Sequence, residues 1–326
     1  MLPIIQKRGI FYAISGTLFV AAVLLWIAWG LKLGIDFTGG SLMEVTYSAS
    51  RPAIADVRAA LDPLKVENLN IQTAGDTGYL LRFKEVSEET HQKILTALRD
   101  ELAPKTAPAA TKPAAAASEK GATVAQDTTN TVTEKRFSTI GPSIGQELRT
   151  RAIYSLILVV LGIIIYIAWS FRKVSYPIES WKYGVAANVA LLHDLMITVG
   201  IFVVLGRYFN VEVNTPFVAA MLTILGYSVN DTIVVFDRIR ENLHRYEGAF
   251  EDIVNKSVNE TMVRSINTSS TVMLVLFAIF FFGGDTIRDF TIALLFGVFF
   301  GTYSSIFIAS ALLVDWHKFM TRLQGE

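Results

Sequence analysis

The chain has no cysteine, only four histidines and little charge for its 326 residues. Without cysteine there is no disulfide, no thiolate zinc or iron–sulfur centre and no cysteine nucleophile. Charged residues make up 18% of the chain, against roughly 25% in an average soluble domain. The 29 basic and 29 acidic residues cancel, so no overall charge attracts nucleic acid. These shortages argue against several enzyme classes and against a nucleic-acid-binding protein.

Two motifs of common catalytic classes are also missing. The sequence contains neither a Gly-x-x-x-x-Gly-Lys phosphate loop nor a His-Glu-x-x-His zinc motif. With so few histidines, metal-assisted hydrolysis has few ligands to draw on. We therefore expect a protein that is not an enzyme and that holds neither a cofactor nor a metal ion.

What the chain does have is long apolar stretches. Six of them run for roughly 20 residues with few charges, the length that an α-helix needs to cross hydrocarbon. They cover residues 10–31, 152–171, 184–206, 215–236, 265–284 and 290–314. The first is too long for a signal-peptide core and lacks a small-residue cleavage site after it, so we expect an uncleaved span. The sequence thus predicts a polytopic α-helical membrane protein with six transmembrane helices.

Lysine and arginine are unevenly shared between the short loops, and cytoplasmic loops carry more of them. The side that holds residues 1–9, 237–264 and 315–326 has most of these cations. The short loops of the opposite side hold only Arg207 and Arg288. We therefore expect both termini to be cytoplasmic and residues 32–151 to lie outside.

Residues 32–151 are too long for a loop and have a pattern of their own. Strand-like stretches occur at 41–48, 66–73, 79–84 and 132–140, and helical spacing occurs at 52–64 and 87–102. This order predicts a small ferredoxin-like α+β domain, with one four-stranded sheet and two helices on one face. Residues 103–131 are rich in alanine, threonine, proline and lysine, and we expect them to form a disordered insertion.

Three motifs flank or enter the spans. Residues 34–40 read Gly-Ile-Asp-Phe-Thr-Gly-Gly, residues 140–145 read Ile-Gly-Pro-Ser-Ile-Gly, and residues 225–242 read Leu-Gly-Tyr-Ser-Val-Asn-Asp-Thr-Ile-Val-Val-Phe-Asp-Arg-Ile-Arg-Glu-Asn. Together with the division into one span, an outer domain and five further spans, these motifs resemble the SecD/SecF branch of the resistance-nodulation-division superfamily. The long motif in the fourth span is the most specific of the three.

The resemblance implies one half of a two-part transporter. In the family it resembles, the two halves form a SecD-containing heterodimer and associate with the SecYEG translocon. They use the proton or sodium gradient to promote the export of unfolded proteins. YajC and YidC are further implied partners, and the lipid of the bacterial inner membrane is the implied environment. The alternative is one half of a drug or lipid exporter of the same superfamily. Those exporters usually have a far larger outer domain than residues 32–151 of this chain.

Ionisable residues inside the spans are the candidates for ion transport. A charged side chain in hydrocarbon costs about 2.5–3.5 kcal/mol even on insertion scales, so it must face the bundle, water or a partner. We expect Asp231 to carry the coupling ion, with a buried structural hydrogen bond as the alternative. His193 and Asp194 lie at a similar depth in the third span, and each is a candidate for the relay or for a structural role. The structural role expected for Asp194 is a hydrogen bond to a serine or threonine of another span. Because neighbouring helical residues point about 100° apart, we expect these two side chains not to share a face.

Charged residues near the ends of the fourth and fifth spans complete the candidate set. Arg264 is the candidate counter-charge for Asp231, because an arginine near this point belongs to the relay in the family that the sequence resembles. The alternative is an ordinary cytoplasmic cation. Asp237 and Arg238 are expected to belong to a cytoplasmic charge cluster rather than to pair with Asp231.

Other motif residues have a structural interpretation. Gly34, Gly39 and Gly40 are expected to permit tight backbone geometry beyond the first span, with Asp36 as the cap of a turn. Gly226 and Asn230 belong to the fourth-span motif. A stripe of small residues in the sixth span predicts close helix packing; its members are Gly297, Gly301, Ser305 and Ala309.

Overall fold

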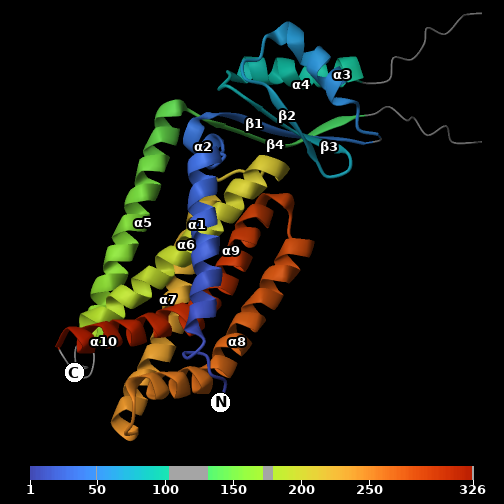
Figure 1. The fold of residues 1–326 in the computed structure, drawn as a ribbon. Helices are drawn as coiled ribbons and strands as arrows, with labels where there is room; N and C mark the ends of the chain where they lie inside the picture. The colour runs from blue at the N-terminus through green and yellow to red at the C-terminus, as the bar shows by residue number, and fades with distance from the viewer. Residues whose placement is uncertain (49, 103–130, 172–178, 325–326) are drawn as a thin grey trace, which may run out of the picture. The chain divides into compact units, whose positions relative to one another are not determined.

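The computed structural model describes residues 1–48, 50–102, 131–171 and 179–324, and the chain divides into two units. The first unit holds Met1–Gly34 and Leu148–Glu326, and the second holds Ile35–Glu147. The insertion predicted at 103–131 lies, except for Thr131, outside the described residues. The predicted fold class is confirmed, because the chain combines six long apolar helices with a small α+β unit (Figure 1).

Within the described residues, six helices are long and apolar enough to cross a membrane. They are α1 (Arg8–Trp29), α5 (Pro142–Ser170), α6 (Ser180–Phe209), α7 (Thr215–Arg245), α8 (Phe250–Phe282) and the run of α9 (Asp285–Ser304), η2 (Ser305–Ala309) and α10 (Ser310–Gln324). Several helices continue well beyond the predicted spans; α8, for example, begins 15 residues before position 265. Hydropathy marks only the apolar part of a helix, whereas backbone hydrogen bonding continues into polar sequence.

Two helices of the first unit, α7 and α9, pack closely through the predicted stripe of small residues. A Cβ atom added at Gly297 would lie 2.2 Å from Ile224 of α7, and one added at Gly301 would lie 2.9 Å from the Cβ of Ser228. Ser305 continues the contact, since its hydroxyl lies 2.8 Å from the hydroxyl of Thr232. The prediction of close packing along this stripe is therefore confirmed. Small residues allow the two backbones to approach and their polar side chains to meet.

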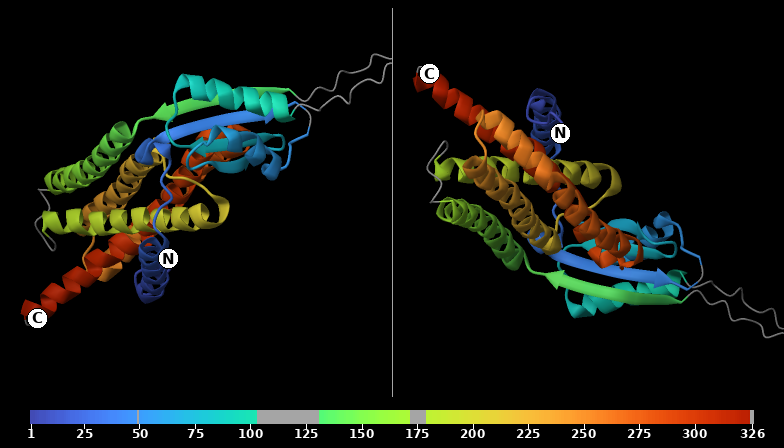
Figure 2. Two further views of the ribbon diagram at one scale, coloured as in Figure 1. Left: turned by 90° about the horizontal axis from the view of Figure 1, so that it is seen from above. Right: turned by 90° about the horizontal axis from the view of Figure 1, so that it is seen from below.

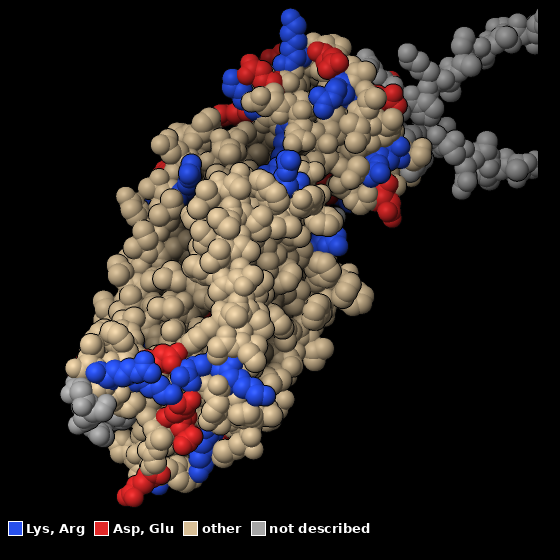
Figure 3. Space-filling model, viewed as in Figure 1, with Lys and Arg blue, Asp and Glu red and all other residues tan. Residues whose placement is uncertain are grey.

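Both ends of the chain lie at the same end of the helix bundle. The Arg8 guanidinium forms ion pairs with Glu251 of α8 and Asp315 of α10, each at 2.8 Å. The backbone N–H groups of Ile4 and Ile5 donate to the side-chain oxygen of Asn255. On the face shown in Figure 3, uncharged residues cover the middle of the helices, and charged side chains gather near α10. This distribution is typical of a membrane protein with a polar rim.

The second unit is a four-stranded antiparallel sheet with the strand order β2-β3-β1-β4. Its elements are α2 (Ile35–Thr38), β1 (Gly40–Tyr47), α3 (Ile54–Leu61), η1 (Asp62–Leu64), β2 (Asn70–Ala74), β3 (Gly78–Phe83), α4 (Glu88–Leu102) and β4 (Val132–Ile140). Order and direction agree with the predicted ferredoxin-like topology. The strand predicted from residue 66 begins only at Asn70, because Lys65 and Asn68 adopt left-handed conformations and turn the chain first.

Alternating residues of the strands build the core of this unit. Met43, Val45 and Tyr47 of β1 are buried, as alternation on one face of a strand requires. Val57 of α3 and Ile94 of α4 belong to the same buried cluster. Figures 1 and 2 show both helices on one face of the sheet, as predicted. The core lies between this face and the two helices.

The backbone at the start of β1 depends on glycine. Gly39 has a φ of +74°, a left-handed conformation, and an added Cβ would lie 2.8 Å from the Cα of Pro142. Gly75, in the β2–β3 turn, also has a positive φ (+58°), but an added Cβ would meet nothing within 4 Å. A substitution at Gly75 therefore introduces backbone strain alone, whereas one at Gly39 introduces strain and steric overlap.

We expect Gly39→Ala to destabilise the protein more than Gly75→Ala. Left-handed strain alone costs about 1–2 kcal/mol for an L-residue, and Gly39→Ala adds overlap with backbone atoms that cannot rotate away. Unfolding of the purified chain in detergent, followed by the fluorescence of a label in the second unit, measures the difference. Equal losses of stability would show that Pro142 moves aside without cost.

Candidate ion-relay site

The Asp194 carboxylate is fully buried and ties three helices together. The hydroxyls of Ser228 on α7 and Ser304 on α9 both donate to Oδ2, each at 2.7 Å. The His193 Nδ1 lies 3.0 Å from Oδ1. Hydrogen bonds to a charged group are worth about 1.5–3 kcal/mol each. Both oxygens of Asp194 are thus engaged, which fixes this carboxylate in one position.

His193 and Asp194 share a hydrogen bond although they are adjacent on α6. The prediction that their side chains do not share a face did not include this bond, which rotation of the side chains allows although the Cβ directions differ. Their other contacts are with different helices, α1 for His193 and α7 and α9 for Asp194. The His193 ring also lies parallel to that of Phe19 on α1, with centroids 6.5 Å apart. Its Nε2 atom is buried and has no hydrogen-bond partner among the described residues. His193 therefore links α1 to the Asp194 carboxylate.

Asp231 is also buried, but it has fewer hydrogen-bond partners than Asp194. The Ser265 hydroxyl on α8 donates to Oδ1 at 2.6 Å. The second oxygen, Oδ2, has no hydrogen-bond partner among the described residues. A buried charged oxygen without a hydrogen-bond partner destabilises the folded protein. An ion or donor that binds this oxygen removes much of that destabilisation. Of the two carboxylates, Asp231 is the one with an open oxygen.

Hydroxyl groups continue from Asp231 into the bundle. Ser269 of α8 donates to the Ser265 carbonyl at 2.8 Å and also contacts the hydroxyl of Thr302 on α9. The Tyr227 hydroxyl of α7 donates to Ser269 at 3.0 Å. Together with Ser228, Thr232, Ser304 and Ser305, these residues form what we call the hydroxyl seam. It places polar groups on the inner surfaces of α7, α8 and α9, between Asp231 and Asp194.

Arg264 is exposed and immediately precedes Ser265, the hydrogen-bond partner of Asp231. Its guanidinium forms no hydrogen bond or ion pair with another described residue, although its backbone carbonyl accepts from the Thr268 hydroxyl at 2.9 Å. It lines a hollow of about 440 Å³ together with Ile233, Val234, Asp237, Arg238, Glu241, Glu260 and Thr261. The predicted counter-charge is thus close enough to influence Asp231 without being locked to it.

The other charged residues of this hollow are paired among themselves. Arg238 bonds Glu241 and Glu260, each at 2.6 Å, and Asp237 pairs with Arg240 at 2.5 Å. Arg238 is therefore engaged away from Asp231, as expected from its distance along the helix. Of these pairs only Arg238–Glu260 joins α7 to α8, and the other two lie within α7. Arg264 is left as the free cation of the residues that line the hollow.

The remaining motif residues fall into two groups. Gly34 donates its N–H to the carbonyl of Val213 at 2.7 Å, and Asp36 lies in the first turn of α2. Gly40, like Gly39, has a positive φ and approaches backbone, here the Phe83 carbonyl. Gly226 and Asn230 are exposed on α7, one turn apart, and nothing lies within 4 Å of a Cβ at Gly226. The first group shapes turns, whereas the second leaves part of α7 uncovered.

Residues 141–145 match the Gly-x-Ser-x-Gly pattern of serine hydrolases. Ser143 lies in the first turn of α5, is exposed, and forms no hydrogen bond with another described residue. A serine nucleophile needs a histidine and an acid in contact with it. Among the described residues, Ser143 has neither partner.

The sequence predicted a serine or threonine of another span as a possible partner of Asp194, but it did not identify which serines hold the two carboxylates. Ser228, Ser265 and Ser304 each donate to Asp194 or Asp231, yet a lone serine in an apolar span is common. The packing of the helices decides which helix each serine faces, and hydropathy does not predict that packing. The available signal was that Ser228 lies within the fourth-span motif, that Ser265 follows Arg264, and that Ser304 precedes Ser305 of the small-residue stripe.

Comparison with known proteins identifies the family. The description "Protein export membrane protein SecD/SecF, C-terminal" matches residues 120–319, and "SecD/SecF GG Motif" matches residues 30–50. The chain is 40% identical to the protein translocase subunit SecF of Thermobaculum terrenum, with 98% of this chain and 95% of that protein covered. The chain belongs to the SecD/SecF protein-export family, on its SecF branch.

Other members of the SecF branch are similar over nearly their whole length. The subunit of Anaerolinea thermophila is 37% identical, with 98% of this chain and 95% of that protein covered. The crystal structure of SecDF from Thermus thermophilus superposes with a TM-score of 0.76 at 30% identity. The match covers 96% of this chain but 38% of the SecDF chain. The chain is thus a multi-pass membrane protein with the length of a SecF subunit.

The different surroundings of the two carboxylates predict different effects on stability. Asp194→Asn replaces a carboxylate that accepts three hydrogen bonds, and we expect a loss of about 2–3 kcal/mol. Asp231→Asn keeps an acceptor for Ser265 and removes an unpaired charged oxygen, so we expect a change within about 1 kcal/mol. Thermal unfolding of the purified chain in detergent measures both, with exposed Asp237→Asn as the control. A larger loss for Asp231→Asn than for Asp194→Asn would contradict the assignment.

Proposed function

We propose that the chain is the SecF half of a SecDF complex that uses an ion gradient to promote protein export through SecYEG. The observation that carries the proposal is the Asp231 carboxylate, with one oxygen bonded by Ser265 and the other open. A proton or a sodium ion on the open oxygen removes the negative charge that attracts Arg264. Loading and release of the ion therefore change the attraction between α7 and α8.

The uncovered part of α7 supports a SecD partner. Thr223, Gly226 and Asn230 are exposed and lie on one side of the helix, although they fall within an apolar span. Small and polar residues at such positions favour close contact with another helix in a membrane. The SecDF chain of known structure is more than twice as long as the region matched here, which leaves room for the second half. An acidic residue of SecD in this contact would compete with Asp231 for the coupling ion.

The energy available from the gradient is adequate for such a switch. A potential of about 100 mV supplies about 2.3 kcal/mol for each charge that crosses the membrane, which corresponds to about a fiftyfold change in an equilibrium constant. We place the chain in the bacterial inner membrane with both termini cytoplasmic, because most Lys and Arg of the short loops lie on that side. YajC and YidC are further partners in this proposal, and unfolded exported protein is the substrate.

We expect Asp231→Asn to abolish gradient-dependent export while ATP-driven export persists. The amide keeps the shape of the side chain but cannot bind and release a proton. Export into inverted vesicles with SecD present, with and without an ionophore, measures the two components, and ion flux in SecD-containing proteoliposomes measures coupling directly. Asp237→Asn is the matched control, and Asp194→Asn should be milder. Normal gradient-dependent export by Asp231→Asn, combined with its loss in Asp194→Asn, would place the relay on α6 instead.

A further inference from the structure

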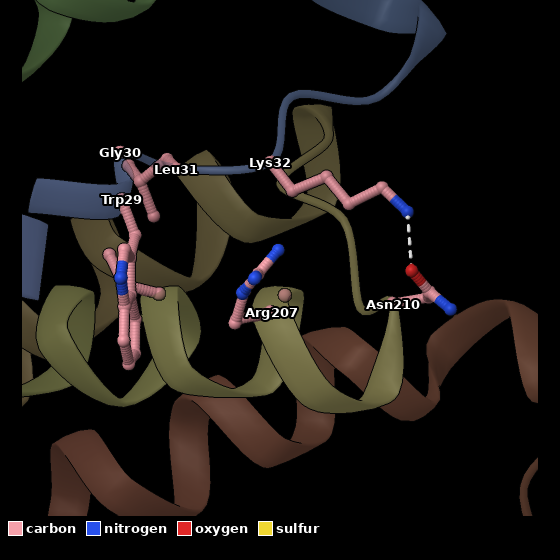
Figure 4. Close-up of a pocket in the computed structure, with 8 residues that line it drawn as sticks. Trp29, Gly30, Leu31, Lys32, Arg207 and Asn210 are labelled. Carbon is pink, nitrogen blue, oxygen red and sulfur yellow. Dashed lines mark hydrogen bonds between the residues drawn. The ribbon is translucent and has the colours of Figure 1, made fainter.

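A hollow of about 320 Å³ lies where α1 and α6 end. It is lined by Trp29, Gly30, Leu31, Lys32, Val203, Gly206, Arg207 and Asn210. Figure 4 shows the Arg207 guanidinium between Trp29 on one side and Lys32 on the other. The volume is within the range of small-molecule sites, about 300–1,000 Å³. No residue of this hollow takes part in the relay described above.

The two cations of the hollow differ in their surroundings. The Lys32 ammonium donates to the Asn210 side-chain oxygen at 3.0 Å and lies 3.6 Å from the Glu212 carboxylate (Figure 4). Arg207 is exposed and forms no hydrogen bond or ion pair with any other described residue. Its guanidinium can therefore bind an anion through two parallel N–H groups, which is the geometry that a phosphate matches.

Aromatic residues place the hollow at the membrane surface. The rings of Trp29 and Tyr208 meet edge to face with centroids 6.0 Å apart, and both side chains are exposed, as is Phe209. Tryptophan and tyrosine gather at the level of lipid headgroups. Toward the middle of α1, exposed Ile27 and Leu24 offer an apolar surface for acyl chains. A cation that can bind a lipid headgroup thus lies next to an apolar surface that can contact acyl chains.

We propose that this hollow binds the phosphodiester of a membrane phospholipid, with Arg207 as the phosphate ligand. The last turns of α1 and α6 both end here, and a helix C-terminus carries about half a negative charge, which weakens the attraction for an anion. A free phosphate in water would therefore bind poorly. A lipid is present at high local concentration in the membrane and adds contacts along its acyl chains. A site with weak affinity for phosphate alone is therefore sufficient to bind a lipid.

Native mass spectrometry of the full chain in detergent, titrated with phosphatidylglycerol, tests the proposal. We expect Arg207→Gln to weaken binding of one lipid by about tenfold, as loss of a charge-assisted pair predicts. Arg207→Lys, which keeps the charge but not the fork, should weaken it less. Arg288→Gln is the matched control, because this exposed arginine also lies against an aromatic ring, 4.9 Å from the centroid of Phe280, but outside the hollow.

Three results would overturn the proposal. Equal lipid binding by Arg207→Gln and Arg288→Gln, with both variants unfolding at the wild-type temperature, would show that Arg207 is not a ligand. Binding of diacylglycerol as strong as that of phosphatidylglycerol would show that the site recognises acyl chains alone. Displacement of the lipid by millimolar inorganic phosphate would show that the site takes the free ion.

Discussion

A carboxylate buried among apolar helices must be offset by hydrogen bonds or by a nearby cation, and the first unit is arranged around this requirement. Asp194 meets it fully, with Ser228, Ser304 and His193 as partners. Asp231 meets it in part, with Ser265 bonded to one oxygen and the charge of Arg264 nearby. The first arrangement fixes three helices, and the second leaves an oxygen that can exchange an ion.

Close helix packing makes these contacts possible. Gly301 allows α9 to approach α7 at Ser228, which brings Ser304 within reach of the same Asp194 oxygen. Directly after Ser304, the five residues Ser305–Ala309 form a π-helical segment. The Ser310 hydroxyl donates to the Ser305 carbonyl at 3.2 Å. Such π-helical segments are frequent at functional sites because they shift the helical register. Here the shift coincides with the last contact of the hydroxyl seam.

The sequence predicted the elements better than the contacts. Hydropathy and alternation predicted the six spans and the four strands, and the strand over 132–140 matches β4 in both bounds. Asp231 became a candidate because charge in an apolar span is rare, and Arg264 became one through the family resemblance. The serines were missed, since the helix that each one faces depends on rotation and packing. The His193–Asp194 bond was missed because helix geometry fixes Cβ directions but not side-chain rotamers.

The central claim is that the Asp231 carboxylate exchanges the coupling ion, a proton or sodium, while Asp194 stays fixed. Infrared difference spectroscopy of the purified SecD-containing complex during a pH jump, without sodium, tests it most directly, because either kind of ion site takes up a proton at low pH. The account predicts a protonated-carboxyl band that rises as the pH falls, persists in Asp194→Asn and vanishes in Asp231→Asn. A titrating band that persists in Asp231→Asn and vanishes in Asp194→Asn would contradict it.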